Sequence, residues 1–109
     1  MNDLKVKNII LALAEKIRDT YKPEKIILYG SFAYGYPDRD SDIDLLIIKD
    51  TYERPIDRRV SVRRMVSALR KGYAFSSIVV TPKELKSRLE IGDQFFEEIL
   101  SKGEVLYAK

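Results

Sequence analysis

Apolar residues at the start of the chain recur with the period of a helix, and the next group has the character of a strand. Within residues 3–20 they fall at steps of four, three and four, which predicts an amphipathic helix with one buried face. Pro23 cannot continue this helix, and the run KIILY at 25–29 predicts a first strand that stops at Gly30. The residues that set the helical period are Val6, Ile10, Leu13 and Ile17.

A second strand is predicted in DIDLLIIKD at 42–50, after the loop SFAYGYPDRDS. Its aliphatic run is nearly continuous instead of alternating with polar residues, so we expect a central strand that is buried on both faces. Pro55 then opens a helix that we expect to reach about Lys71, with Gly72 as its stop. Further along we expect a strand at 75–81, helices at 82–89 and after Asp93, and a last strand at 104–108.

This order of elements predicts an α/β (α+β) fold, in which helices pack on a small mixed sheet. With 109 residues the chain has room for one hydrophobic core, so we expect a single domain over 1–109. The longest apolar runs are too short to cross a membrane, and acidic and basic residues interrupt the first apolar residues, unlike in a signal peptide. A cytoplasmic protein without membrane attachment is therefore expected.

The composition limits the chemistry that the chain can perform. It contains no cysteine and no histidine, which excludes disulfides, thiolate metal sites and the commonest general base at neutral pH. Carboxylates, hydroxyls, lysine, arginine or the backbone must therefore do any chemical work. The basic residues are unevenly placed, since residues 53–72 hold seven of them against two acidic ones. This segment either attracts phosphate or forms a solvated helix face, and we do not expect direct nucleic-acid binding because exposed aromatics are not interleaved with the charges.

Aspartates occupy every second position of DRDSDIDLLII, from Asp38 to Asp44. Residues i and i+2 of a strand point to the same face, so Asp42 and Asp44 project side by side, roughly 6 to 7 Å apart. Like charges at this spacing repel each other unless a cation or water lies between them, which makes the pair either a metal site or a polar strand end. The segment fails the EF-hand pattern in both registers, and Mg²⁺, which takes one or two carboxylates and substrate phosphates, suits it better than Ca²⁺. Asp38 and Asp40 are expected to be solvated loop residues.

A glycine and a serine follow the first predicted strand directly. Gly30 allows the backbone to turn closely, and Ser31 can cap the short helix FAYG and donate a hydrogen bond to an anion. A phosphate on Ser31 and the nearby amides would face a metal held by the two aspartates. The segment is neither a P-loop nor a dinucleotide-binding fingerprint, because no GK[ST] follows and the glycine spacing is wrong.

The combination of Gly30 and Ser31 with Asp42-Ile43-Asp44 after ten intervening residues resembles the hG[GS]…DxD signature of the DNA polymerase β superfamily of nucleotidyltransferases. Within it, GSFAYG…SDIDLLI looks like the minimal nucleotidyltransferase group, which is often paired with HEPN-domain proteins. The resemblance implies Mg²⁺-dependent transfer of a nucleoside monophosphate, most simply AMP from ATP, to an acceptor hydroxyl. It implies that Asp42 and Asp44 are catalytic and hold the metal, that Gly30 and Ser31 bind the nucleotide's phosphates, and that the partner is a HEPN-type protein.

Two positions depart from the family pattern. Active members carry a third carboxylate on a later strand, where this chain has Ser76 or Ser77, and the nearest acid downstream is Glu84. A serine cannot act as a base at neutral pH or supply the missing charge. Tyr34 stands where paired antitoxins commonly have arginine. The chain is therefore either a nucleotidyltransferase with an incomplete carboxylate triad or an antitoxin of the same fold that binds a HEPN-type toxin with weak or no catalysis.

Adjacent helical positions cannot both face one core, and this applies to the pair Phe95 and Phe96. One of the two rings is expected to mark a surface for a partner or for a homo-oligomer, or to form a local lid over the loop at 31–41.

Overall fold

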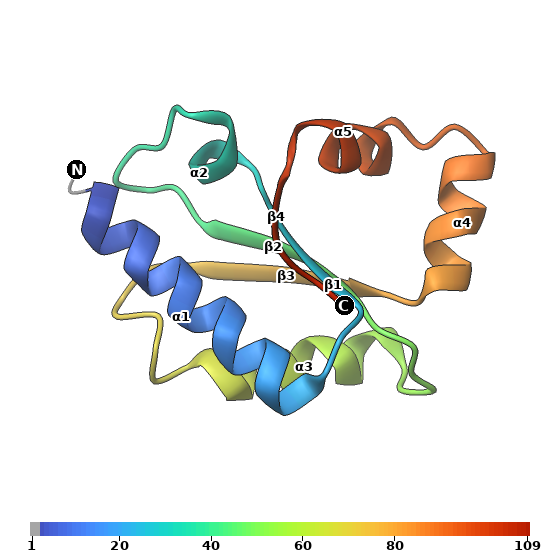
Figure 1. The fold of residues 1–109 in the computed structure, drawn as a ribbon, viewed down its shortest axis with the longest axis horizontal. Helices are drawn as coiled ribbons and strands as arrows, with labels where there is room; N and C mark the ends of the chain where they lie inside the picture. The colour runs from blue at the N-terminus through green and yellow to red at the C-terminus, as the bar shows by residue number, and fades with distance from the viewer. Residues whose placement is uncertain (1–2) are drawn as a thin grey trace.

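The computed structural model describes residues 3–109, which form five helices and four strands (Figure 1). The helices are α1 (Asp3–Tyr21), α2 (Ser31–Tyr34), α3 (Pro55–Val66), α4 (Pro82–Glu90) and α5 (Gln94–Lys102). The strands are β1 (Lys25–Tyr29), β2 (Ile43–Ile48), β3 (Phe75–Val80) and β4 (Glu104–Ala108). The expected order of elements is thus confirmed, as is the mixed α/β class.

The four strands form one mixed sheet in the order β3-β2-β1-β4. Strand β1 runs antiparallel to both of its neighbours, whereas β2 and β3 are parallel and are connected through α3. A parallel pair requires such a crossover, because the chain must return to the same end of the sheet before the second strand begins. Strands β3 and β4 are the two edges.

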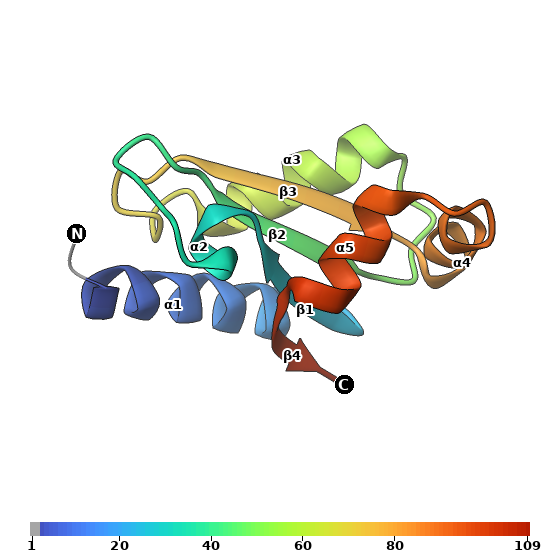
Figure 2. The ribbon, with the colours of Figure 1, turned by 90° about the horizontal axis from the view of Figure 1, so that it is seen from above.

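Both faces of the sheet are covered by helices. Figure 1 shows α1 and α3 below the sheet and α2, α5 and α4 above it, and in Figure 2 α5 again lies between α2 and α4. Along β2 the side chains alternate between two hydrophobic cores, with Ile43, Leu45 and Ile47 in the first and Leu46 and Ile48 in the second. The expectation of a central strand buried on both faces is therefore confirmed.

Helix α3 ends earlier than the sequence predicts. It stops at Val66 instead of continuing to about Lys71, and the residues up to Gly72 form turns. The amide of Leu69 bonds the carbonyl of Val66 at 2.9 Å, and both Lys71 and Gly72 have positive φ. These tight turns bring the chain back to the start of β3, so the requirements of the crossover override the helical spacing of the apolar residues. Arg70 and Lys71 therefore do not belong to a helix.

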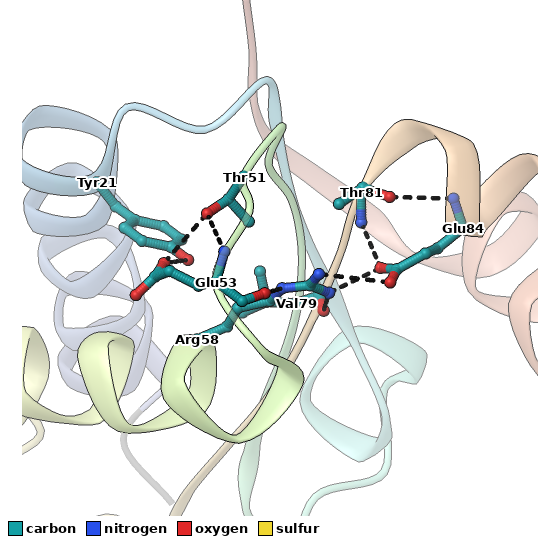
Figure 3. A network of polar contacts seen from close by, with 7 residues as sticks. All are labelled: Tyr21, Thr51, Glu53, Arg58, Val79, Thr81 and Glu84. Carbon is teal, nitrogen blue, oxygen red and sulfur yellow. Dashed lines mark hydrogen bonds and ion pairs between the residues drawn. The ribbon is translucent and has the colours of Figure 1, made fainter.

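A buried arginine joins α3, β3 and α4 at one end of the sheet (Figure 3). Arg58 is 5% exposed and donates to the backbone carbonyls of Glu53 (2.9 Å) and Val79 (3.3 Å) and to Glu84 Oε1 (2.7 Å). Glu84 also forms a capping box with Thr81 at the start of α4. Burial of an arginine needs such saturation of its N–H groups, since an unpaired buried charge is strongly unfavourable. Arg58 therefore belongs to the structural core and is removed from the basic surface that the sequence suggested.

Among the described residues, no helix has the length and apolar character required to cross a membrane.

Candidate active site

The end of β1 and the start of β2 lie side by side because the two strands are antiparallel. Tyr29 pairs with Asp44 in the ladder, so the residue after Tyr29 turns over the aspartate. Gly30 has φ 78° and ψ −164°, a combination that is essentially restricted to glycine. A Cβ atom added to Gly30 would overlap Asp44 Oδ2 and lie 3.2 Å from Asp44 Cγ. Gly30 and Asp44, both expected at the site from the sequence, are thus in direct contact, with the Gly30 backbone packed against the Asp44 carboxylate.

The acid pair sits at the open end of β2. Asp42 is exposed just before the strand, whereas Asp44 is half-buried on the face of the second core. Burial, together with the negative charge of Asp42, raises the pKa of Asp44 to about 6. An added divalent cation would favour the ionised form of both carboxylates, and their oxygen donors are the type that Mg²⁺ prefers. The two side chains therefore fit a magnesium site that is completed by substrate oxygens.

The loop at 31–41, which follows β1, differs in one detail from the expectation. Helix α2 begins at Ser31 with Gly30 as its N-cap, and no side chain caps it. The Ser31 hydroxyl instead donates to Ser41 Oγ at 2.9 Å, so the predicted capping by Ser31 is wrong. The carbonyl of Gly30 accepts from the amides of Ala33 (3.0 Å) and Tyr34 (2.9 Å), while the first amides of a helix have no partner within it. The Ser31 hydroxyl is linked to the acid pair through Ser41, the residue directly before Asp42.

Ser41 joins the candidate site through Ser31 and was not among the residues that the sequence predicted there. Its Oγ accepts from the Ser31 hydroxyl and from the amide of Asp38 (2.9 Å), and it lies directly before Asp42. Asp38, expected to be only solvated, accepts from the amide of Asp40 at 2.8 Å and shapes the same turn. Ser41 thus connects Ser31 and the turn at Asp38 to the acid pair. The signal available in the sequence was its position between Asp40 and Asp42, directly before the acid pair.

The ladder between β2 and β3 decides which serine stands beside the acid pair. Ser76 is the register partner of Asp44 and shares its face, whereas Ser77 pairs with Leu45 and faces the first core. No third His, Cys, Asp or Glu joins Asp42 and Asp44 within residues 3–109. Glu53 and Glu84 follow the far ends of β2 and β3, where they bond Tyr21 and Arg58. Within the described part of the chain, no other carboxylate therefore takes the place of the third acid that active members of the family carry.

Aromatic rings surround the Tyr29 side of the site. Phe96 is buried in the second core, whereas Phe95 is 46% exposed and contacts the edge of Tyr29 at 5.7 Å between ring centroids. Adjacent helical positions diverge, as expected, and the exposed ring lies over the strand residue that pairs with Asp44. The exposed ring of Phe95 fits both expected roles, a partner surface and a local lid, and the choice between them stays a prediction. Burial also raises the pKa of Tyr29 to about 12, so its hydroxyl stays protonated at neutral pH.

The chain belongs to the polymerase β nucleotidyltransferase family, whose model matches residues 12–109. A relative in Methanocaldococcus jannaschii that is named a protein adenylyltransferase is 34% identical over 108 residues, which cover 98% of this chain and 100% of the relative. A second protein of that name and organism is 34% identical over 90 residues, or 78% of this chain and 61% of that protein. The predicted membership of a nucleotidyltransferase family is therefore confirmed.

Solved structures agree with the fold. The crystal structure of a toxin–antitoxin with AMP-PNP matches with a TM-score of 0.62 at 23% identity, covering 100% of this chain and 75% of that one. The toxin–antitoxin MntA–HepT matches with a TM-score of 0.59 at 18% identity, over 94% of this chain and 73% of that one. These two neighbours therefore share the fold of this chain.

Proposed function

We propose that this protein binds a Mg²⁺–nucleotide complex at Gly30, Ser31, Asp42 and Asp44 and transfers a nucleoside monophosphate, most simply AMP from ATP, to a hydroxyl. The observation that carries the proposal is the close contact of the Gly30 backbone with the Asp44 carboxylate. Without a side chain at residue 30, the nucleotide's phosphates can approach the metal-binding oxygens from the loop side. The match to proteins named as protein adenylyltransferases supports AMP as the transferred group and a protein as the acceptor.

The proposed reaction is an in-line displacement at the α-phosphorus. The acceptor oxygen forms a bond to this phosphorus, the bond to the bridging α–β oxygen breaks, pyrophosphate leaves, and the hydroxyl proton passes to solvent. Asp42 and Asp44 would hold Mg²⁺, which neutralises charge on the triphosphate. The amides at the start of α2 and the Ser31 hydroxyl would orient the β- and γ-phosphates. Residues of this chain thus account for binding and alignment.

The step that this chain supports poorly is deprotonation of the acceptor. Ser76 holds the position beside Asp44, and a serine hydroxyl does not accept a proton at neutral pH. We therefore expect slow transfer. A second candidate function follows from the same observation: a nucleotide-binding antitoxin that inhibits a HEPN-type toxin without modifying it. The toxin–antitoxin complexes among the structural neighbours favour such a partner.

Calorimetric titration with ATP tests the binding step. The wild-type chain is expected to bind ATP with Mg²⁺ and to lose this binding in EDTA or after Asp42→Ala. Asp40→Ala is the matched control, because Asp40 is an exposed aspartate of the same loop whose side chain lies outside the pair. Metal-independent binding, or equal binding by the two variants, would contradict the proposed site.

Transfer is tested with ATP labelled on the α-phosphate and a co-expressed HEPN-type partner. Label on the partner, with release of pyrophosphate, supports the enzyme. Inhibition of the toxin without incorporation of label, together with intact ATP binding, supports the antitoxin instead.

A further inference from the structure

Strand β3 is an edge of the sheet, and its backbone groups alternate between the two sides. The amide of Ile43 bonds the carbonyl of Ala74 at 2.8 Å, and the amide of Lys49 bonds that of Val80 at 2.9 Å. In this parallel register the even-numbered residues of β3 direct their N–H and C=O groups to β2. Phe75, Ser77 and Val79 therefore direct theirs away from the sheet.

Only the first half of this outer edge is open. The carbonyl of Val79 accepts from the buried Arg58 at 3.3 Å, which closes the end of the strand that lies near α4. Within the described residues, no hydrogen bond reaches the outward backbone groups of Phe75 and Ser77. The open half is also the half next to the acid pair, since Ser76 pairs with Asp44. An unpaired strand edge is a template on which another chain can add a strand.

A small hollow of about 100 Å³ flanks this open edge on the α3 side. Arg59 and Arg63 of α3 line it together with Phe75 and Ser77. Two exposed apolar side chains of α3, Ile56 and Val60, line it as well. Neither arginine forms an ion pair with a described carboxylate, whereas Arg54 pairs with Asp57 and Arg58 with Glu84. The positive charge at this hollow is thus available to a ligand.

We propose that the open edge of β3 binds an extended acidic segment of a partner protein as an added strand. Alternate side chains of such a strand point to opposite faces. On the α3 face, acidic side chains would meet Arg59 and Arg63. On the other face, the residue between them would lie next to Ser76, beside Asp44. A serine, threonine or tyrosine of the partner at that position would present its hydroxyl to Asp42 and Asp44. The open edge of β3 would then hold the acceptor of the transfer reaction, a role that rests on the proposed function.

The observations favour a peptide over a nucleic acid. The ladder groups of Phe75 and Ser77 match a peptide backbone, and the hollow has the size of one or two side chains. Base stacking needs exposed rings, and Phe75, the one ring that lines the hollow, is buried. Arg59 and Arg63 thus acquire a specific role, which is the selection of an acidic segment.

The charge requirement is tested with a fluorescein-labelled peptide of about eight residues in which Glu and Ser alternate. Anisotropy is measured on the full chain without nucleotide. Arg59→Glu with Arg63→Glu is expected to weaken binding about tenfold, because two attractions become repulsions. The control Lys83→Glu with Arg88→Glu makes the same change of charge on exposed positions of α4 and is expected to bind as the wild type does. A peptide in which Lys and Ser alternate is not expected to bind.

The backbone requirement has its own matched pair. Ser77→Pro removes the outward N–H without removing a bond to β2, and proline is tolerated on edge strands. It is expected to weaken binding of the same peptide about tenfold, since a ladder bond is lost. Ser77→Ala removes the hydroxyl but keeps the N–H, and it is expected to bind clearly more tightly than Ser77→Pro. Thermal unfolding followed by circular dichroism confirms that both variants are folded.

Wild-type binding of the Glu–Ser peptide by both the charge-reversed and the proline variants would overturn the proposal. It would also be overturned if an oligoadenylate bound through Arg59 and Arg63 with no effect of Ser77→Pro, because the site would then recognise phosphate. In the transfer arm, labelled ATP is expected to label the Glu–Ser peptide but not a Glu–Ala peptide, and labelling is expected to fall with Ser77→Pro. Peptide binding without ATP binding would contradict the proposed function and leave the docking site standing. ATP binding without peptide binding would contradict the docking site and leave the proposed function standing.

Discussion

The backbone of Gly30 lies directly against the carboxylate of Asp44, so closely that no other residue fits at position 30 without displacing it. This contact follows from the antiparallel register, in which Tyr29 pairs with Asp44 and the chain turns immediately afterwards. The loop expected to hold phosphates and the acid expected to hold metal are therefore one structural unit. A change in either residue should affect both functions.

Gly30→Ala is expected to abolish Mg²⁺-dependent ATP binding and to destabilise the fold by about 1–3 kcal/mol, because of both the positive φ and the overlap with Asp44. Gly35→Ala is the control, since Gly35 also has a positive φ, 95°, but an added Cβ would meet nothing within 4 Å. It should lose stability and still bind the nucleotide. Calorimetric titration and urea unfolding measure the two effects, and equal ATP binding by the two variants would contradict the coupling.

Asp44→Asn is expected to stabilise the metal-free protein at pH 7 by about 1 kcal/mol, less than the full pKa shift would give, because solvent screens a half-buried carboxylate. The folded pKa of about 6 lies above the ordinary value of 3.8, so the folded state binds the proton more tightly than the unfolded state. The contribution of Asp44 to wild-type stability is therefore greatest below pH 4 and decreases as the pH rises through 6. The amide does not titrate, so the stability gain should disappear in acid.

Urea unfolding in EDTA between pH 4 and 7 checks this expectation. Added Mg²⁺ and ATP should stabilise the wild type and leave the Asp44→Asn variant unchanged. A stability difference that does not depend on pH would show that the ionisation of Asp44 is not its origin.

Ser76→Asp is expected to raise the rate of nucleotidyl transfer by about 10²-fold, within the range that a positioned general base contributes. The reason is its register pairing with Asp44 on the same face of the sheet. Ser77→Asp introduces the same group one residue later, on the face of the first core, and should give no gain. The two variants are compared by their rates of pyrophosphate release with the same acceptor. Equal rates would show that the position of Ser76 beside Asp44 is not important for transfer.

Glu84→Gln is expected to destabilise the fold by about 2 kcal/mol at pH 7, because Arg58 would keep its buried charge and lose its counter-ion. The hydrogen bond from Arg58 lowers the pKa of Glu84 below the ordinary value of 4.5. The contribution of Glu84 to stability is therefore complete above pH 4.5 and is lost as the pH falls through the lower folded pKa. Glu98→Gln, which breaks the exposed pair with Lys102, should cost less than about 0.5 kcal/mol. Urea unfolding at pH 7 and pH 3 measures both, and equal losses would contradict a special role of the buried pair.

Local patterns in the sequence determine most of the fold, because helices and strands leave periodic traces. The run LLII predicts a strand with two buried faces, and Pro82 marks the first position of the helix that becomes α4. The pair Asp42 and Asp44 and the turn at Gly30 are equally local, since strand periodicity and glycine geometry place them. The bounds of α3 are not local, and its early end reflects the path that the chain needs to reach β3.

Relations between distant residues required the tertiary structure. The sequence leaves Ser76 and Ser77 as alternatives at the third acid position, and only the register of β2 on β3 selects Ser76. The sequence likewise counts Arg58 with the other arginines, and only packing shows that it is buried while Arg59 and Arg63 remain at the open edge of the sheet. The alternation of residues along a strand determines which face of the sheet a side chain lies on. Its neighbours on that face depend on which strand lies alongside and in which register. The pairing and register are determined by the burial of the whole sheet between its helices.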